Sequence, residues 1–71
     1  MTLGQTIKHI RRAKHWRQKR LREATGLTTR YLSEIERDRV DPRLSVVVRI
    51  AQALGVRVAC LVGEETADDR R

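Results

Sequence analysis

The sequence predicts an all-α domain, a compact bundle of five helices. Most of its apolar residues are aliphatic, because the 71 residues include one Trp, one Tyr and no Phe. These aliphatic residues recur at intervals of three and four, which is the period of a helix with one buried face. Glycine, proline and polar residues separate five such segments. A chain of this length forms a single domain.

A first helix of about a dozen residues is expected to begin after Thr2, whose side chain can cap it. Its apolar stripe consists of Leu3, Ile7 and Ile10. We expect this helix to end near His15, and Trp16 to turn back into the core. A second, shorter helix is expected over about residues 17–25, with an inward face formed by Leu21 and Ala24.

Residues 26–36 predict a tight turn followed by a third, short helix over about residues 28–36. Gly26 permits a backbone conformation that a residue with a Cβ resists, and Thr28 can accept from the free amides of the first turn. The side chains that hold this helix to the core are Leu27, Leu32 and Ile35. Its other face carries Thr29, Arg30, Ser33 and Glu34. A short helix that exposes such groups, directly after another helix, suits the DNA major groove.

A polar connection over residues 37–42 follows, in which Asp38 tolerates a left-handed turn. Pro42 and Ser45 mark the start of a fourth helix, which is expected to stop at a left-handed Gly55. The apolar stripe of this helix is expected to consist of Leu44, Val47, Val48, Ala51 and Leu54.

A fifth helix is expected over about residues 57–62. Beyond it the composition turns polar and acidic. Residues 1–63 would therefore form the folded domain, and residues 64–71 a frayed tail.

The chain is strongly basic. Sixteen Lys and Arg against nine Asp and Glu give a formal net charge of +7. Residues 1–22 contain no acidic residue, and their bases are Lys8, Arg11, Arg12, Lys14, Arg17, Lys19, Arg20 and Arg22. A field of this sign attracts polyanions and speeds their encounter. A solvated basic face without a specific partner is the alternative, but such density on so short a chain favours nucleic acid.

Other classes of protein fit the sequence poorly. Cys60 is alone, so the chain holds neither a disulfide framework nor a thiolate cluster, which suits a reducing cytoplasm. His9 and His15 have no Cys or carboxylate at ligand spacing, so no metal or other cofactor is expected. The longest apolar run, residues 58–62, is too short to span a bilayer. Since no nucleophile–base set or phosphate-binding loop is present either, we expect a cytoplasmic protein without membrane association, small-molecule substrate or enzymatic activity.

The order and spacing of these residues resemble the Cro and phage-repressor type of helix-turn-helix domain, the XRE-like group. On the first helix and through the turn, the resemblance lies in Leu3-Gly4, Ile7, Ile10-Arg11, Gln18, Leu21 and Gly26-Leu27-Thr28. After the turn it lies in Tyr31 to Glu36, Pro42, Leu44, Ile50-Ala51 and Ala53-Leu54-Gly55-Val56. It covers roughly residues 3–62 and implies a lambda-repressor-like bundle with the two-helix motif at about residues 17–36.

The resemblance implies DNA contacts on three parts of the chain. At the start of the second helix, the candidates for phosphate contact are Arg17, Gln18 and Lys19. The recognition helix, about residues 28–36, would meet bases and backbone through Thr28, Thr29, Arg30, Tyr31, Ser33 and Glu34. The following loop would touch phosphates through Arg37, Arg39 and Arg43. Phosphate contacts position a protein on DNA without reading its sequence.

Arg30 is the main candidate for reading a base, because its guanidinium fits guanine O6 and N7. Glu34 could accept from cytosine N4, or instead hold Arg30 through an i, i+4 pair. Tyr31 is expected to pack, with its hydroxyl at a phosphate, rather than to read a base. Arg11 and Glu36 match positions where this family joins its first helix to the end of the recognition helix by an ion pair, so we expect that pair here.

The chain departs from the family's pattern in and before its second helix. His15 stands where glycine is common, and Arg17 where a Ser or Thr cap is common. Arg22 stands where a small residue lets the two motif helices pack closely, so its side chain must extend outward or the helices must sit further apart. Lys19 and Arg20 oppose the helix dipole at ~0.3–1 kcal/mol each, a cost that a bound phosphate would offset.

These observations predict a sequence-specific transcriptional regulator that binds double-stranded DNA. A homodimer on a near-palindromic operator is expected, because one short recognition helix covers too few bases. The subunit contact is expected to use Val56, Val58, Leu61 and Val62. The alternatives on the same fold are a protein-bridging, coactivator-like module with weak DNA selectivity, a DNA-binding antitoxin, or a controller of a restriction–modification operon.

Overall fold

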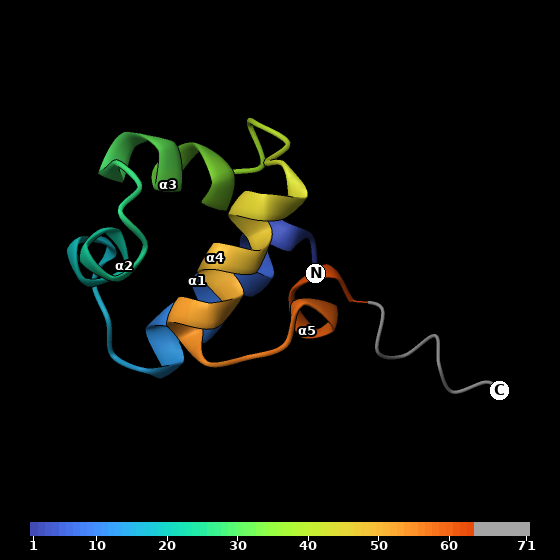
Figure 1. Ribbon diagram of the computed structural model, residues 1–71, viewed down its shortest axis with the longest axis horizontal. Helices are drawn as coiled ribbons and strands as arrows, with labels where there is room; N and C mark the ends of the chain where they lie inside the picture. The colour runs from blue at the N-terminus through green and yellow to red at the C-terminus, as the bar shows by residue number, and fades with distance from the viewer. Residues whose placement is uncertain (64–71) are drawn as a thin grey trace, which may run out of the picture.

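The computed structural model describes residues 1–63, which form five helices and no strand (Figure 1). The helices are α1 (Leu3–Ala13), α2 (Gln18–Thr25), α3 (Thr29–Glu36), α4 (Leu44–Leu54) and α5 (Val58–Val62). The predicted all-α, five-helix fold is therefore confirmed. The predicted tail, residues 64–71, lies outside the described residues, so the domain boundary stays a prediction.

The helices enclose one hydrophobic core. α3 packs on α1 and α2, α2 also packs on α4, and α5 packs against α1 and α4. Every helix contributes a fully buried side chain, and the largest of these are Ile7, Leu21, Leu32, Ile35, Ile50, Leu54 and Leu61. In Figure 1, α3 lies along one edge of the bundle and α5 lies on the side away from α2. Among residues 1–63, no helix has the length and apolar content needed to cross a membrane.

The helix ends follow the predicted signals. The Thr2 hydroxyl accepts from the Gln5 amide at 3.1 Å, and the Gln5 side chain accepts from the Thr2 amide at 3.0 Å, which is a capping box. Gly26 and Gly55 close α2 and α4 with φ of 79° and 74°. His15, where the family has glycine, adopts φ 61° after α1, so the departure at this position keeps the left-handed turn.

Three predicted side-chain placements were wrong. Ala24 is exposed, and Thr25 is buried in its place, where its hydroxyl donates to the Leu21 carbonyl at 2.7 Å. This hydrogen bond satisfies the hydroxyl, so a polar residue can occupy the inner face of α2. Leu44, the first residue of α4, is 67% exposed, and Ile50 is buried instead. Leu61 was expected at a subunit contact but is 1% exposed, because α5 inserts it between α1 and α4.

Gly4 lets the start of α1 approach the end of α3. A Cβ at this position would clash with the Ile35 carbonyl oxygen and would lie 2.8 Å from the Glu36 carbonyl oxygen. Both are backbone atoms and cannot rotate away. The absence of a side chain at Gly4 therefore permits the close approach of α1 to the end of α3.

Candidate nucleic-acid interface

The α2–α3 unit places one helix at the surface. Residues 26–28 link the two helices, and the Thr28 hydroxyl caps α3 by accepting from the Tyr31 amide at 3.0 Å. Leu32 and Ile35 are buried beneath α3, whereas Thr28, Thr29 and Arg30 are exposed on it. The link is short and one face is buried, so the opposite face of α3 stands out from the bundle.

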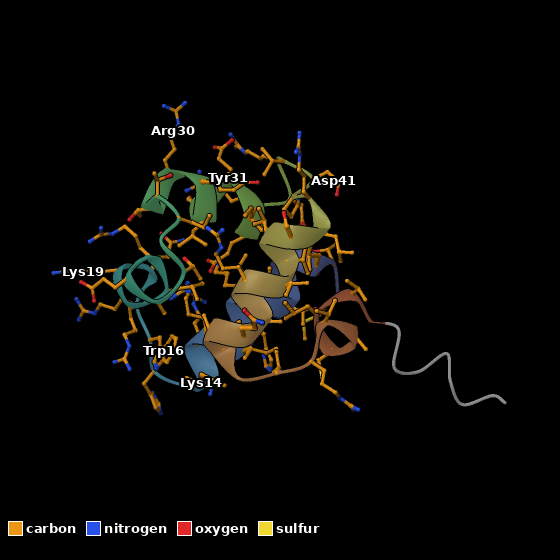
Figure 2. The ribbon with its side chains drawn as sticks, in the orientation of Figure 1. Lys14, Trp16, Lys19, Arg30, Tyr31 and Asp41 are labelled. Atoms are coloured by element: carbon orange, nitrogen blue, oxygen red, sulfur yellow. The ribbon has the colours of Figure 1, made fainter. Side chains whose placement is uncertain are left out.

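Arg30 extends away from the molecule at the start of α3, on the same edge as Tyr31 and Asp41 (Figure 2). Among residues 1–63 the only ion pair joins Arg11 to Glu36, so Glu34 does not hold Arg30 through a salt bridge. Glu34 is half-buried, as is Ser33. The Arg30 guanidinium, with five N–H donors, is therefore available to an external acceptor.

Tyr31 is half-buried and packs against the hydrophobic core. This packing favours the structural interpretation of Tyr31 over a role in reading bases. It also holds the first turn of α3 against the bundle.

Arg11 and Glu36 form a buried, bidentate ion pair. The Nε of Arg11 donates to Oε2 of Glu36 at 2.8 Å and Nη2 donates to Oε1 at 3.0 Å, with the side chains 8% and 3% exposed. Nη1 of Arg11 also donates to the Trp16 carbonyl at 2.7 Å. Oε1 of Glu36 accepts from Nε2 of Gln18 at 3.1 Å. The end of α3 is thus tied to α1, to the α1–α2 connection and to the first residue of α2.

Gln18 is held by this network. Its side chain is half-buried, and its amide nitrogen donates to Glu36. A phosphate contact by Gln18 stays a prediction, and the second N–H of the amide is the group that would make it.

A basic cavity of about 240 Å³ lies where α1, α2 and α3 meet. It is lined by Lys8, Arg11, Arg12, Gln18, Ser33, Glu36 and Arg37. Three of these cations, Lys8, Arg12 and Arg37, are not paired with a carboxylate among residues 1–63. The cavity is therefore suited to an anionic group such as a phosphate. Lys8 and Arg12 were not among the predicted DNA-contacting residues, although their i, i+4 spacing within the acid-free residues 1–22 indicates a shared basic face.

The remaining predicted arginines and Lys19 are exposed. Arg37, Arg39 and Arg43 lie in the loop between α3 and α4, and Arg17 and Lys19 lie at the start of α2. Arg22 is half-buried and lines a cavity of about 220 Å³ beside the start of α3, outside the core. Arg22 thus lies at the junction of α2 and α3, since the other residues that line this cavity are residues 26–29.

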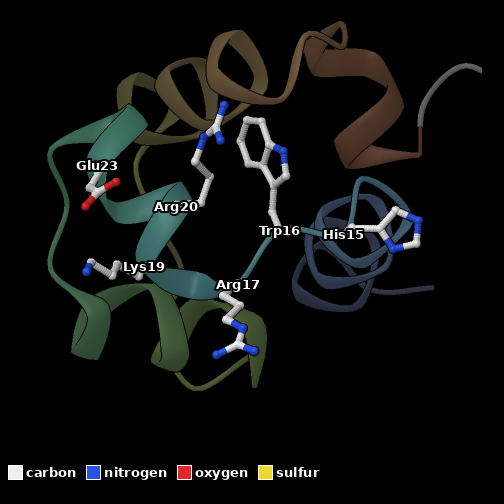
Figure 3. Close-up of a pocket in the computed structure, with 6 residues that line it drawn as sticks. All are labelled: His15, Trp16, Arg17, Lys19, Arg20 and Glu23. Carbon is white, nitrogen blue, oxygen red and sulfur yellow. The ribbon is translucent and has the colours of Figure 1, made fainter.

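A second cavity, of about 440 Å³, surrounds Trp16 (Figure 3). The guanidinium carbon of Arg20 lies 4.6 Å from the centre of the indole ring, and Nζ of Lys14 lies 5.8 Å from it. Trp16 also packs against the core, as predicted. In Figure 3, Trp16 and Arg20 point to one side of α2 and Arg17 to the other, toward α3. Figure 2 places Trp16 and Lys14 on the edge opposite Arg30. Lys14 and Arg20 make cation–π contacts with Trp16, which lies in the α1–α2 connection.

The four residues predicted for a subunit contact are not equivalent. Leu61 belongs to the core, and Val56 and Val58 are half-buried against it. Val62 is 43% exposed at the end of α5. Of this set, Val62 has the most surface to offer a second subunit.

Comparison with known proteins supports the same part of the chain. A family model described as helix-turn-helix matches residues 7–59. The immunity repressor protein of Bacillus phage phi105 is 48% identical over 66 residues, which are 93% of this chain and 46% of that protein. The HTH-type transcriptional regulator SutR of Escherichia coli (strain K12) is 37% identical over 54 residues, which are 76% of this chain and 30% of that protein. The chain spans less than half the length of these two curated relatives.

A solved structure has the same arrangement of helices. The hypothetical transcription factor NHTF from Neisseria superposes with a TM-score of 0.80 at 35% sequence identity. The match covers 84% of this chain and 69% of that one.

Proposed function

The chain belongs to the helix-turn-helix family of the Cro and phage-repressor type, and we propose that it is a sequence-specific DNA-binding transcriptional regulator. It acts as a homodimer on a near-palindromic operator in double-stranded DNA. The observation that most supports this proposal is the placement of Arg30. It is exposed at the start of α3 and has no carboxylate partner among residues 1–63, and the other face of this helix is buried. Because the phi105 relative is named an immunity repressor protein, we expect DNA binding by this chain to repress transcription.

Binding divides into attraction, positioning and reading. The net charge of +7 attracts DNA. Phosphates are contacted from the start of α2, by Arg17 and Lys19, and from the loop after α3. These contacts position the duplex, so that α3 enters the major groove and Arg30 donates to guanine O6 and N7. A two-fold dimer presents two such helices about one helical turn of DNA apart.

The test is a binding selection from random duplexes, sequenced for the wild type and for Arg30→Ala. The wild type is expected to enrich a two-fold symmetric site. Arg30→Ala is expected to lose preference at one position in each half-site, with discrimination of ~1–3 kcal/mol removed there. Arg39→Ala is the matched control, because it removes an exposed arginine that is expected to touch only phosphate and so should weaken all duplexes alike.

Two outcomes would contradict the proposal. Equal affinity of the wild type for all duplexes would refute sequence-specific regulation and would favour a protein-bridging module. Uniform weakening by Arg30→Ala would show that Arg30 contacts phosphate and that another residue reads the base.

A further inference from the structure

Asp38 follows the C-cap residue of α3 and lies between two arginines that are predicted to contact phosphates, Arg37 and Arg39. Its φ is 60°, in the left-handed region that few residues other than glycine adopt. Its amide donates to the Ile35 carbonyl at 3.0 Å, and the Arg39 amide donates to the Glu34 carbonyl at 2.9 Å. These two bonds form a Schellman turn, which sets the direction in which the loop leaves α3.

The Asp38 carboxylate also binds the start of α1. Its Oδ2 accepts from the Thr2 hydroxyl at 2.6 Å, and its Oδ1 accepts from the Gly4 amide at 3.0 Å. A Cβ on Gly4 would lie 2.7 Å from this Oδ1, so the absence of a side chain there permits the contact. The carboxylate therefore sits at the positive end of the α1 dipole.

This contact is the main side-chain attachment of the loop. Within the described residues, Asp38 makes every side-chain hydrogen bond between loop 37–43 and the rest of the chain. The arginines of this loop are exposed. Asp38 keeps its negative charge among these arginines, and both of its carboxylate oxygens accept hydrogen bonds from the start of α1.

We propose that Asp38 is a positioning residue for DNA binding: it ties loop 37–43 to the start of α1 and so holds Arg37 and Arg39 where they meet phosphates. The inference rests on the proposed function, because it explains how loop 37–43, one part of the proposed DNA interface, is held in place. Without the tie the loop arginines are free to move, and fewer of them are in place when DNA binds.

The test compares Asp38→Gly with Asp38→Asn in the full chain. Both variants remove the same negative charge, and both residue types tolerate the left-handed conformation. Asparagine keeps an oxygen for the Gly4 amide and an N–H for the Thr2 hydroxyl, whereas glycine keeps neither. Affinity for a duplex is measured from low to high salt, and circular dichroism confirms that each variant is folded at the temperature used.

Relative to Asp38→Asn, we expect Asp38→Gly to bind about tenfold more weakly for each phosphate that it no longer touches, and to have a salt slope less steep by about one for each such phosphate. The preference among duplex sequences should be unchanged, because α3 keeps its place. Asp41→Gly, at an exposed residue of the same loop, is a second control and should keep the wild-type slope. A variant that was merely less stable would not alter the slope while folded.

Equal affinities and slopes for Asp38→Gly and Asp38→Asn would overturn the inference. If Asp38→Gly does not fold, Thr2→Ala removes one of the two bonds, and a slope equal to that of the wild type would then refute the tie. The slope can be measured on any duplex, so this result is separate from the sequence preference that tests the proposed function.

Discussion

The guanidinium of Arg11 joins α1 to the end of α3 and to the α1–α2 connection. It binds both carboxylate oxygens of Glu36 and the Trp16 carbonyl, and Glu36 also accepts from Gln18. Two buried charges cost free energy to desolvate, so the value of such a pair lies in fixing one geometry more than in raising stability. Here that geometry is the position of the end of α3 against α1 and the start of α2.

At the residue scale, Glu36→Ala is expected to lower the free energy of unfolding by ~3–5 kcal/mol, because it leaves the buried Arg11 cation without its partner. Urea denaturation followed by circular dichroism measures this change. Glu23→Ala, which removes an exposed carboxylate from α2, is the control and should change stability by less than about 0.5 kcal/mol. Equal denaturation midpoints for the two variants would mean that the pair contributes nothing to the fold.

At the scale of elements, α2, α4 and α5 begin without a side-chain cap. Their N-cap residues are Arg17, Arg43 and Arg57, and no acidic residue occupies the first turn of any of the three. In α2 this is most pronounced, since Lys19 and Arg20 follow within the first turn. Such a helix start is suboptimal in the free protein and becomes favourable when a phosphate lies over it.

Arg17→Ser is therefore expected to stabilise the free protein by about 1 kcal/mol, because serine caps a helix start, and to weaken DNA binding. Thermal denaturation and duplex titration measure the two effects, which should have opposite signs. Arg57→Ser introduces the same cap at α5, on the side of the bundle away from α2, and should leave DNA affinity unchanged. Stronger DNA binding by Arg17→Ser would show that this helix end does not meet a phosphate.

The helix ends could be predicted from the sequence at residues whose type strongly favours one local role. Thr2, Gly26 and Gly55 mark helix ends by chemistry that does not depend on the rest of the chain, and each end lies where it was predicted. The inward faces of short helices were less predictable. In an eight-residue helix, positions three and four apart share a face, so the choice of Thr25 over Ala24 depended on how α2 packs against α4.

The interface was predictable only in part. Exposure of Thr29 and Arg30 follows from burial of Leu32 and Ile35, which helical spacing predicts. The basic cavity does not follow from spacing, because it requires α1 to lie close to α3, and that approach depends on the missing side chain of Gly4. Whether an acidic neighbour on α3 holds the exposed arginine depended on side-chain rotamers, which no pattern of residue types determines.

At the scale of the whole molecule, the bundle separates its surfaces by function. The edge with Arg30 carries the proposed reading helix, and the opposite edge carries Trp16 with its stacked cations. A single domain offers one recognition helix, so sequence specificity at the level of a regulator depends on a second copy. The exposed large apolar residues of the described chain limit where that copy can bind: Met1, Val40, Leu44 and Val62.

We expect the second subunit to bind at the α5 face, where Val62 is 43% exposed beside the half-buried Val58. Val62→Ser should weaken dimerisation by ~1–2 kcal/mol because less apolar surface is buried, and so weaken binding to a two-fold site while binding to an isolated half-site is unchanged. Leu44→Ser is the matched control, because Leu44 is 67% exposed at the start of α4. Analytical ultracentrifugation with and without each duplex measures both effects. If Leu44→Ser disrupts the dimer and Val62→Ser does not, the two-fold contact lies at the start of α4. That contact would then determine the distance between the two recognition helices.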